Sequence, residues 1–254
     1  MGILPDFLNL KELLKDAFLP PLCASCGKIS GQFLCTECLS SIAFLGEDIC
    51  LRCGSPLSSE DSGCRYQGNK RFDKKISGYK ICSLCKQESF HFYRARSFSL
   101  YCDAVSVIIK KYKYKGYDCL GKIITGFLKH AFYFYYGKEK IDYIETVPVY
   151  GNGTIQVNHM QILAADLAEC LRIPYGSNII KIRQTSKQQK LDRAGRKINL
   201  AGAFKVKNCL QSYGKNYLVI DDVWTTGSTL NEISSALKNA GADRIYVLSV
   251  ARGA

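Results

Sequence analysis

Residues 217–229, with the sequence YLVIDDVWTTGST, decide the fold of the C-terminal part of this chain. The apolar residues 217–220 predict a buried strand, which two acids and a small hydroxyl-rich turn follow before an expected helix. The N–H groups and the positive dipole end of a helix start attract a phosphate. Gly227 lets the backbone approach that phosphate, and the carboxylates of Asp221 and Asp222 can accept hydrogen bonds from two ribose hydroxyls. The stretch therefore predicts a cradle for a phosphorylated ribose.

Four hydroxyl side chains around the glycine can add donors to the phosphate, and these are Thr225, Thr226, Ser228 and Thr229. A capped helix after an acidic strand end is the plainer interpretation, because Asp pairs and Ser or Thr caps are each common. The complete string resembles the signature of type I phosphoribosyltransferases, with Trp224 where aliphatic residues are typical. That resemblance implies binding of phosphoribosyl pyrophosphate (PRPP). The chain has no G-x-x-x-x-G-K-[ST] motif and no G-x-G-x-x-G after a strand, so P-loop and dinucleotide sites are not supported.

Strands and helices alternate from about residue 141 onward. Apolar strand candidates cover residues 141–149, 177–182, 203–206, 217–223 and 244–250. Helix candidates cover residues 157–171 and 228–240, and residues 100–136 show helical apolar spacing that breaks near Gly116. Continuous apolar strands that alternate with helices are typical of a parallel sheet covered on both faces. We therefore predict an α/β fold.

The charge of the chain favours an anionic partner. The 254 residues carry a formal net charge of +13, while 47% of them are hydrophobic, which is enough for a core. Nucleic acid, a phosphate-rich substrate and an acidic membrane surface all fit such a balance. A basic protein without such a partner is the alternative.

Thirteen cysteines are many for a chain of this size, and nine of them precede residue 86. Eight of the nine form four C-x-x-C pairs, which are Cys23/Cys26, Cys35/Cys38, Cys50/Cys53 and Cys82/Cys85. Two such pairs supply the four thiolates of a tetrahedral structural zinc site, so four pairs predict two zinc ions. Bound metal would also stabilise a segment with little apolar surface to bury. Thioredoxin-like redox chemistry is the competing interpretation of a single pair.

The spacing leaves open whether consecutive pairs share an ion or whether the pairs interleave in a cross-brace. Cys64 stands outside the pairs and is a candidate free thiol. A closed four-cysteine site has no open coordination position, so we assign it no catalysis. We predict two domains, with the N-terminal helix and zinc module in residues 1–90 and the second domain in residues 91–254.

Residues 1–20 predict a short amphipathic helix, for which packing on its own domain is preferred to a membrane anchor. Charged residues interrupt its apolar positions, whereas an export signal keeps charge out of them. No run of about 18 uncharged apolar residues occurs in the chain, so no membrane span is expected. Because neither an export signal nor a membrane span is expected, we expect the protein in the reducing cytoplasm.

Further segments carry a resemblance that extends over nearly the whole chain. They are Pro20-Pro21-Leu22-Cys23, Lys113-Tyr114-Lys115-Gly116, Val147-Pro148-Val149, Arg183-Gln184-Thr185, Gln188, Leu191, Arg193, Arg196, Asn199 and Gly202-Ala203-Phe204. With the C-x-x-C pairs and the loop at 217–229, they resemble the ComF-type competence proteins. The resemblance implies a type I phosphoribosyltransferase-like parallel sheet flanked by helices, an N-terminal zinc-binding module, and a link to DNA uptake or processing.

The resemblance also implies where pyrophosphate would bind. Type I enzymes hold it just after the first sheet strand, and the corresponding residues here are Tyr150, Gly151 and Asn152. The basic stretch 183–199 corresponds to a flexible loop that closes over the site, with a solvated linker as the alternative. Within this stretch, Arg193 and Arg196 are the candidates for binding pyrophosphate, because a guanidinium fork matches phosphate oxygens. Mg²⁺ is expected to bind together with PRPP.

The family pattern breaks at one place. An Arg-Gly-aromatic-Asn-Gln string usually leads into the helix where this chain has QVNHMQ at 156–161, and only Asn158 fits that string. His159 has two interpretations, as a general base or as a capping or surface residue at the helix start.

Two functions remain open. The first is a transferase that displaces pyrophosphate from C1 of the ribose with an unidentified acceptor, helped by Mg²⁺ and arginine. The second is a non-catalytic protein that senses PRPP or binds single-stranded nucleic acid, since no base-reading segment is recognisable. The interleaved Lys and Tyr of residues 110–117 favour nucleic acid, because lysines track phosphates and tyrosines stack on bases. Packing of these tyrosines in the core is the equal alternative.

Overall fold

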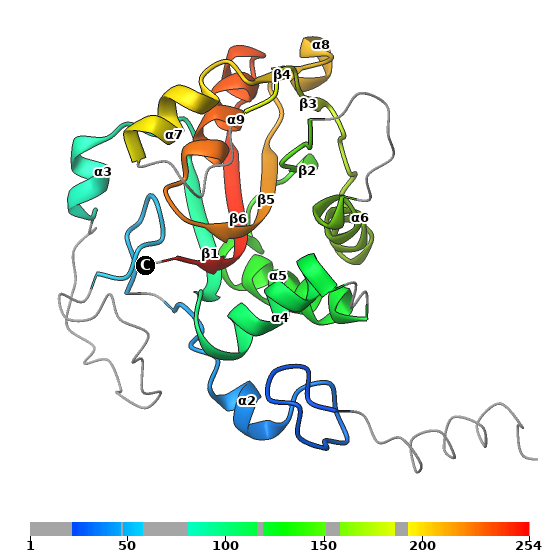
Figure 1. The fold of residues 1–254 in the computed structure, drawn as a ribbon. Helices are drawn as coiled ribbons and strands as arrows, with labels where there is room; N and C mark the ends of the chain where they lie inside the picture. The colour runs from blue at the N-terminus through cyan, green and yellow to red at the C-terminus, as the bar shows by residue number, and fades with distance from the viewer. Residues whose placement is uncertain are drawn as a thin grey trace, which may run out of the picture.

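The computed structural model describes residues 22–46, 48–57, 81–115, 119–150, 158–185 and 193–253. They form a central sheet with helices on both sides, and the cysteine-rich segments lie at one edge and one end of this body (Figure 1). The helix expected at residues 1–20 and the unpaired Cys64 lie outside the described residues.

Four strands form the central sheet in the order β1-β6-β5-β2, and all neighbours run parallel. Their bounds are Arg94–Leu100 for β1, Tyr143–Thr146 for β2, Tyr217–Trp224 for β5 and Ile245–Arg252 for β6. All residues of β6 are buried, which explains why its sequence is apolar rather than alternating. Because the strands are parallel, their carboxyl ends meet at one edge of the sheet.

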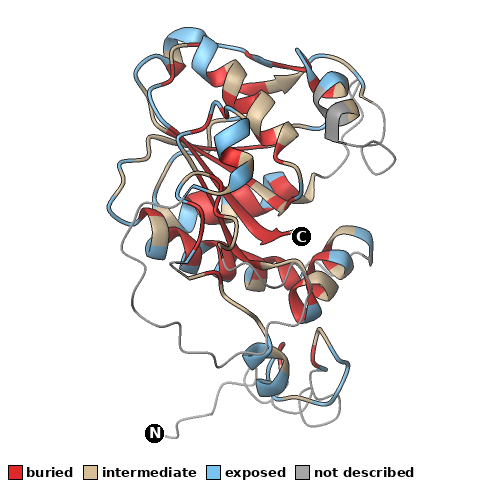
Figure 2. Ribbon diagram, turned by 90° about the vertical axis from the view of Figure 1, so that its left-hand side faces the viewer, coloured by how far each residue is buried: buried red, intermediate tan, exposed pale blue. Residues whose placement is uncertain are grey.

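Helices cover both faces of the sheet (Figure 1). One face carries α4 (Asp103–Lys115), α5 (Leu120–Tyr136) and α6 (His159–Leu171), and the other carries α9 (Ser228–Asn239) with α7 (Arg193–Leu200) packed beside it. The side chains of β5 alternate between the two faces of the sheet, and each face has its own hydrophobic core. Leu218 and Ile220 pack in the core with α5 and α6, while Tyr217 and Val219 pack in the core with α9. Figure 2 shows the buried residues concentrated in the sheet and on the helix faces against it.

Shorter elements complete the described chain. They are α2 (Thr36–Ser40), α3 (Ser83–Gln87), β3 (Ile179–Lys181), β4 (Phe204–Val206) and α8 (Cys209–Ser212). The predicted fold class, a parallel sheet flanked by helices with an N-terminal four-cysteine module, is confirmed. None of the helices in the described ranges is long and apolar enough to cross a membrane.

Strand β1 was not predicted, so the strand expected at 141–149 is the second of the sheet and not the first. The sequence of β1, RARSFSL, has no apolar run, yet five of its seven residues are buried. Specific polar contacts make this possible: the hydroxyls of Ser97 and Ser249 lie 2.7 Å apart across the β1–β6 pair. Such contacts form only in the folded chain, so local sequence does not indicate them.

Two further expectations were wrong. Strands β3 and β4 do not join the parallel sheet but form a separate antiparallel pair, with Ile179 opposite Val206. Strands of three residues carry too little pattern to indicate their direction. The basic stretch 183–199 is not a loop throughout, because α7 begins at Arg193 and packs against α9.

The run of interleaved Lys and Tyr lies mostly on α4. Tyr112 is buried against α5 and α6, and its hydroxyl donates to the carbonyl of His159 at 3.1 Å. Tyr114 is exposed. Lys111 donates to the carbonyl of Ala24 in the cysteine module. The core interpretation therefore holds for Tyr112, and Tyr114 is the one tyrosine of this run on α4 that solvent reaches.

A buried carboxylate on β2 makes stability depend on pH. Glu145 is 1% exposed, and burial raises its pKa to about 7, against hydrogen bonds from the backbone N–H groups of Asn178 and Ile179. The folded state then binds this proton more tightly than the unfolded state, so the free energy of unfolding falls as pH rises from about 4.5 to 7. We expect Glu145→Gln to stabilise the protein by up to about 3 kcal/mol at pH 8 and to have little effect at pH 4.5.

Urea unfolding of both proteins at the two pH values measures this difference, and Glu169→Gln, at an exposed position of α6, is the control. An equal effect of Glu145→Gln at both pH values would contradict the assignment.

Candidate functional site

The loop singled out by the sequence joins β5 to α9 at the carboxyl edge of the sheet. Asp221 and Asp222 lie within β5, which continues to Trp224 rather than ending before the acids. Gly227 is the N-cap of α9 and has a φ of 75°, a conformation that favours glycine. The Thr226 and Ser228 hydroxyls lie 2.9 Å apart beside it. The first N–H groups of a helix have no acceptor within the helix, so the turn presents donors to an anion.

The two aspartates are held by their own backbone. The Oδ1 atom of Asp221 accepts from the N–H of Asp222 at 2.9 Å, and the Oδ1 atom of Asp222 accepts from the N–H of Val223 at 2.6 Å. Burial, and the nearby charge of Asp222, raise the pKa of Asp221. Asp221 therefore holds its proton to higher pH than a free carboxyl does, and a cation placed beside the pair is favoured.

A lysine from α4 occupies that site. The ammonium of Lys113 forms an ion pair with Oδ2 of Asp222. Burial alone would lower the pKa of Lys113, but the Asp222 carboxylate outweighs it and raises this pKa above its usual value. Lys113 therefore stays charged beside the loop. It was not predicted as a site residue, because its place depends on how α4 packs.

These groups line one cleft of about 420 Å³. Its wall consists of Tyr101, Ile109, Lys113, Tyr114, Val147, residues 221–230 and Gly253. The volume is in the range of roughly 300–1,000 Å³ that small-molecule sites have. All seven residues predicted to bind PRPP, which are Asp221, Asp222, Thr225, Thr226, Gly227, Ser228 and Thr229, line this cleft.

The side chain of Trp224 packs directly against the loop at Gly227. Its indole is fully buried and contacts the rings of Phe90 and Phe92. A Cβ atom at Gly227 would lie only 2.4 Å from Cζ2 of this indole. Only glycine fits above the ring, so the unusual tryptophan and the glycine belong together.

The predicted pyrophosphate residues are described only in part. Tyr150 is partly exposed, beyond the carboxyl end of β2, and Gly151 and Asn152 lie outside the described residues. Arg193 and Arg196 belong to α7, but their side chains also lie outside the described part of the structure. These residues stay predictions.

A second, smaller cavity of about 160 Å³ is also bordered by Lys113 and Asp222, at the start of α6. Asn158 caps this helix by accepting from the N–H of Met160 at 3.0 Å. His159 lines the cavity, and within the described residues its buried Nδ1 atom has no hydrogen-bond partner. The capping role thus belongs to Asn158, and His159 packs edge-on against Tyr112.

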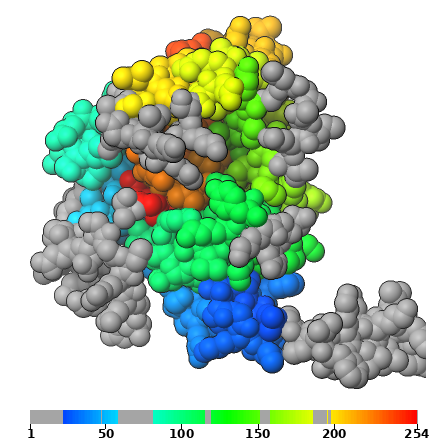
Figure 3. All heavy atoms as spheres, in the orientation of Figure 1, coloured from blue at the N-terminus to red at the C-terminus, as the bar shows by residue number. Residues whose placement is uncertain are grey.

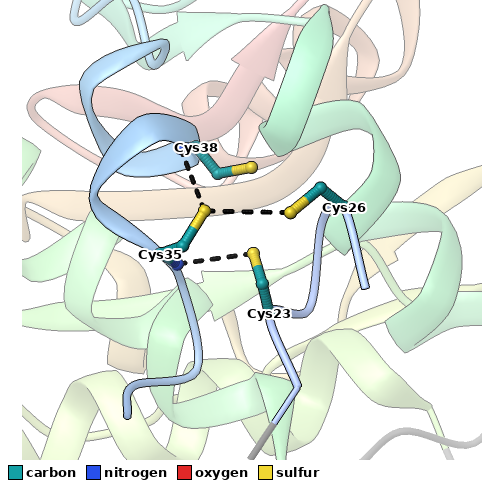
Figure 4. Close-up of side chains that lie close together, drawn as sticks. All are labelled: Cys23, Cys26, Cys35 and Cys38. Carbon is teal, nitrogen blue, oxygen red and sulfur yellow. Dashed lines mark hydrogen bonds between the residues drawn. The ribbon is translucent and has the colours of Figure 1, made fainter. Parts of the chain in front are cut away.

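The eight predicted metal ligands form two clusters of four, Cys23/Cys26/Cys35/Cys38 and Cys50/Cys53/Cys82/Cys85. Consecutive pairs therefore share a site, and the cross-brace is excluded. In the first cluster the Sγ atoms of Cys26 and Cys35 lie 3.8 Å apart (Figure 4), and in the second those of Cys53 and Cys82 lie 3.7 Å apart. Four thiolates bound tetrahedrally to zinc at about 2.3 Å lie roughly 3.8 Å from one another, so the donor set fits zinc.

The two clusters differ in their surroundings. The first lies at one end of the molecule, where residues 22–46 pack against α4 (Figure 3), and its Cys26 is exposed. The second belongs to the core on the α9 face, where Cys50 and Cys53 are almost completely buried with Trp224. Only the second cluster is thus part of the core that carries the loop.

Two buried arginines lie against the second cluster. Arg252 donates to the carbonyl of Cys53 at 2.7 Å, and Arg96 donates to the carbonyls of Cys50 and Leu51 at 3.3 and 3.1 Å. Four thiolates with one Zn²⁺ carry a net charge of −2, which balances two guanidinium groups. No carboxylate pairs with either arginine within the described residues, so four neutral thiols would leave both buried cations without a counter-charge there. The charge around this cluster therefore also fits a bound zinc ion.

Known proteins are similar both to the cysteine-rich N-terminal segment and to most of the whole chain. The family model of the double zinc ribbon domain matches residues 14–67. Competence protein F of Haemophilus influenzae is 25% identical over 229 residues, which cover 87% of this chain and 97% of that protein. The DNA utilization protein YhgH of Salmonella typhimurium is 26% identical over 86% of this chain and 96% of its own length. The competence protein ComFC of Streptococcus pneumoniae is 25% identical over 86% of this chain and 87% of its own length.

The resemblance to the ComF-type competence proteins is confirmed. Because the ComF-type relatives match over almost their full lengths, the resemblance covers the cysteine module and the sheet together. The double zinc ribbon match ends before Cys82 and Cys85, which complete the second cluster in the folded chain.

Two solved structures are more distantly similar. An allosteric regulatory enzyme of purine biosynthesis matches 51% of this chain at 21% identity with a TM-score of 0.36. The glutamine PRPP amidotransferase of B. subtilis matches 58% at 22% identity with a TM-score of 0.33. This chain spans 26% and 27% of the lengths of those enzymes.

Proposed function

We propose that this protein binds PRPP in the cleft between α4 and the β5–α9 loop. The observation that carries the proposal is that two carboxylates, a glycine-started helix and a charged lysine line one cleft. The 5-phosphate would lie on the N–H groups at the start of α9, and the ribose hydroxyls would donate to Asp221 and Asp222. Mg²⁺ bound together with PRPP would offset the charge of the pyrophosphate.

Titration calorimetry with PRPP in the presence and absence of Mg²⁺ tests this proposal. We expect Mg²⁺-dependent binding of PRPP and weaker binding of ribose 5-phosphate, which lacks the pyrophosphate. Equal affinity for the two ligands, or no heat with either, would contradict it.

The site is suited to transfer of the phosphoribosyl group. A nucleophile would form a bond to C1 while the C1–O bond breaks and pyrophosphate leaves with the electron pair. The contribution of this chain would be to orient the ribose and to stabilise the leaving charge. Release of pyrophosphate from PRPP, measured with candidate bases and amines, separates turnover from binding alone: no release with any acceptor, despite tight binding, would support a PRPP sensor.

Lys113 gives a direct test of the electrostatics. We expect Lys113→Met to weaken PRPP binding roughly 10-fold or more, because a charged hydrogen bond contributes about 1.5–3 kcal/mol. The matched control is Lys122→Met, at an exposed position of α5. Affinities come from the same calorimetric titration, and equal affinities of the two variants would exclude Lys113 from the ligand site.

A second candidate function is binding of single-stranded nucleic acid, and a groove at the amino end of β1 favours it. The groove, of about 850 Å³, is lined by Arg52, His91, Tyr93, Arg94 and Lys238 together with Leu51, Ile81, Phe90 and Phe92. Tyr93 is 47% exposed, and the guanidinium of Arg244 lies 4.8 Å from the centre of its ring. Cations that follow a backbone beside an exposed aromatic ring are the pattern of single-strand sites. The names of the relatives, in competence and DNA utilization, agree with a role in DNA uptake or processing.

For this second function we expect a single-stranded oligonucleotide to bind with an affinity that falls steeply with salt. Tyr93→Ala should weaken binding roughly 10-fold, because stacking contributes about 1–3 kcal/mol per base. Tyr133→Ala, at an exposed position of α5, is the control. Fluorescence anisotropy measures the affinities. If the affinity does not change with salt, or is the same in Tyr93→Ala as in wild type, the groove is not the binding site.

A further inference from the structure

A continuous chain of contacts joins the second cysteine cluster to the phosphate loop. It begins at Cys53, whose carbonyl and Sγ atom both accept from the Arg252 guanidinium, at 2.7 and 3.7 Å. Arg252 lies at the end of β6, is 7% exposed, and has no carboxylate partner within the described part of the chain. Its position therefore depends on the cluster and on the ring above it.

That ring is Trp224. The Cζ atom of Arg252 lies 5.3 Å from the centre of the indole, and the two residues are register partners on β5 and β6. The backbone of Trp224 is fixed as well, because its carbonyl accepts from Gly253 at 2.7 Å. A cation–π contact with so little solvent access contributes more than one at the surface.

The indole then contacts the loop itself. Its edge lies beneath Gly227, close enough that no Cβ atom fits between them. Gly227 is the N-cap of α9 and so sets the direction of the first N–H groups of that helix. A shift of the indole would move the glycine, and a shift of the glycine would turn the donors offered to a phosphate.

We propose that Arg252 is a positioning residue for the PRPP loop, which it holds in place through Trp224, with the second four-cysteine zinc site as its anchor. The proposal rests on PRPP as the ligand of the loop. It implies that the position of Trp224 and of the loop depends on the metal in the second cluster and not on the metal in the first, which contacts α4 but makes no such contact with the loop among the described residues. The zinc module is then part of the ligand site rather than a separate appendage.

Trp224 is the single tryptophan of the chain, so tryptophan fluorescence reports on the surroundings of this one indole. The key variant is Arg252→Met, which removes the charge and keeps most of the length. We expect it to retain two zinc ions, to change the Trp224 emission of the ligand-free protein, and to bind PRPP roughly 10-fold more weakly. Arg172→Met, at the exposed C-cap of α6, is the matched control and should change neither quantity.

Unchanged emission and unchanged PRPP affinity in Arg252→Met would overturn the proposal. Should that variant fail to fold, Arg252→Lys replaces it in the test, since lysine keeps the buried charge but not the guanidinium fork. We expect its PRPP affinity to be lower than that of wild type but still measurable. Wild-type affinity in Arg252→Lys, with wild-type emission, would again overturn the proposal.

A second arm separates this proposal from the choice of ligand. Cys85→Ser and Cys26→Ser each remove one ligand, from the second and the first cluster respectively. We expect Cys85→Ser to change the Trp224 emission and Cys26→Ser to leave it unchanged, whether or not PRPP is the ligand. If wild type fails to bind PRPP while this difference appears, the proposed function fails and the link from zinc to the loop stands. If both variants leave the emission unchanged, the link fails.

Discussion

The double variant Asp221→Asn/Asp222→Asn should lose PRPP binding, with an affinity at least about 100-fold below wild type. Hydrogen bonds to charged groups contribute about 1.5–3 kcal/mol each, and two of them are expected at the ribose. Asparagine keeps the Oδ1 atoms that accept from the N–H groups of residues 222 and 223, so the strand should keep its shape. Calorimetric titration with PRPP and Mg²⁺ gives the affinity.

The control is Asp142→Asn, at the opposite end of the sheet, where this aspartate accepts from the N–H of Asn216 at 2.9 Å. Its PRPP affinity and the zinc content of both variants should equal those of wild type. Unaltered affinity in the double variant would place the ligand somewhere else.

The second large effect concerns the two cysteine clusters. Cys53→Ser should lower the melting temperature by roughly 10 °C or more, because Cys53 is buried in the core beside Arg252. Cys26→Ser should lower it by no more than about 3 °C, because Cys26 is exposed at the end of the molecule. Each variant should retain about one zinc ion, as measured by atomic absorption, and thermal unfolding followed by circular dichroism gives the melting temperatures.

Equal destabilisation by the two serine substitutions would contradict the different roles of the clusters. A zinc content of two in either variant would show that the substituted thiol is not a ligand.

The features that the sequence predicted well are formed by residues that are close together in the sequence. The loop at 217–229 carries its strand, its acids and its glycine in one segment, so a local pattern is enough to indicate them. The C-x-x-C spacing likewise indicates metal binding on its own, although only the fold shows that consecutive pairs share a site. Local order and local chemistry were therefore predictable.

The features that the sequence did not predict depend on tertiary contacts. Strand β1 is buried through a serine pair and through Arg96, which no local pattern indicates. Lys113 reaches Asp222 only because α4 packs across the carboxyl edge of the sheet. Arg252 was not predicted as a functional residue, although it contacts both the second cluster and Trp224. In each case a polar residue acquires its role from a partner that is distant in the sequence.

The central claim is that the β5–α9 loop is the PRPP site, and a crystal structure of the protein with PRPP and Mg²⁺ tests it most directly. The account predicts the 5-phosphate within hydrogen-bond distance of the N–H groups of residues 226–229, with the ribose hydroxyls on Asp221 and Asp222. Density for PRPP elsewhere on the molecule, or an empty loop at a saturating PRPP concentration, would contradict it.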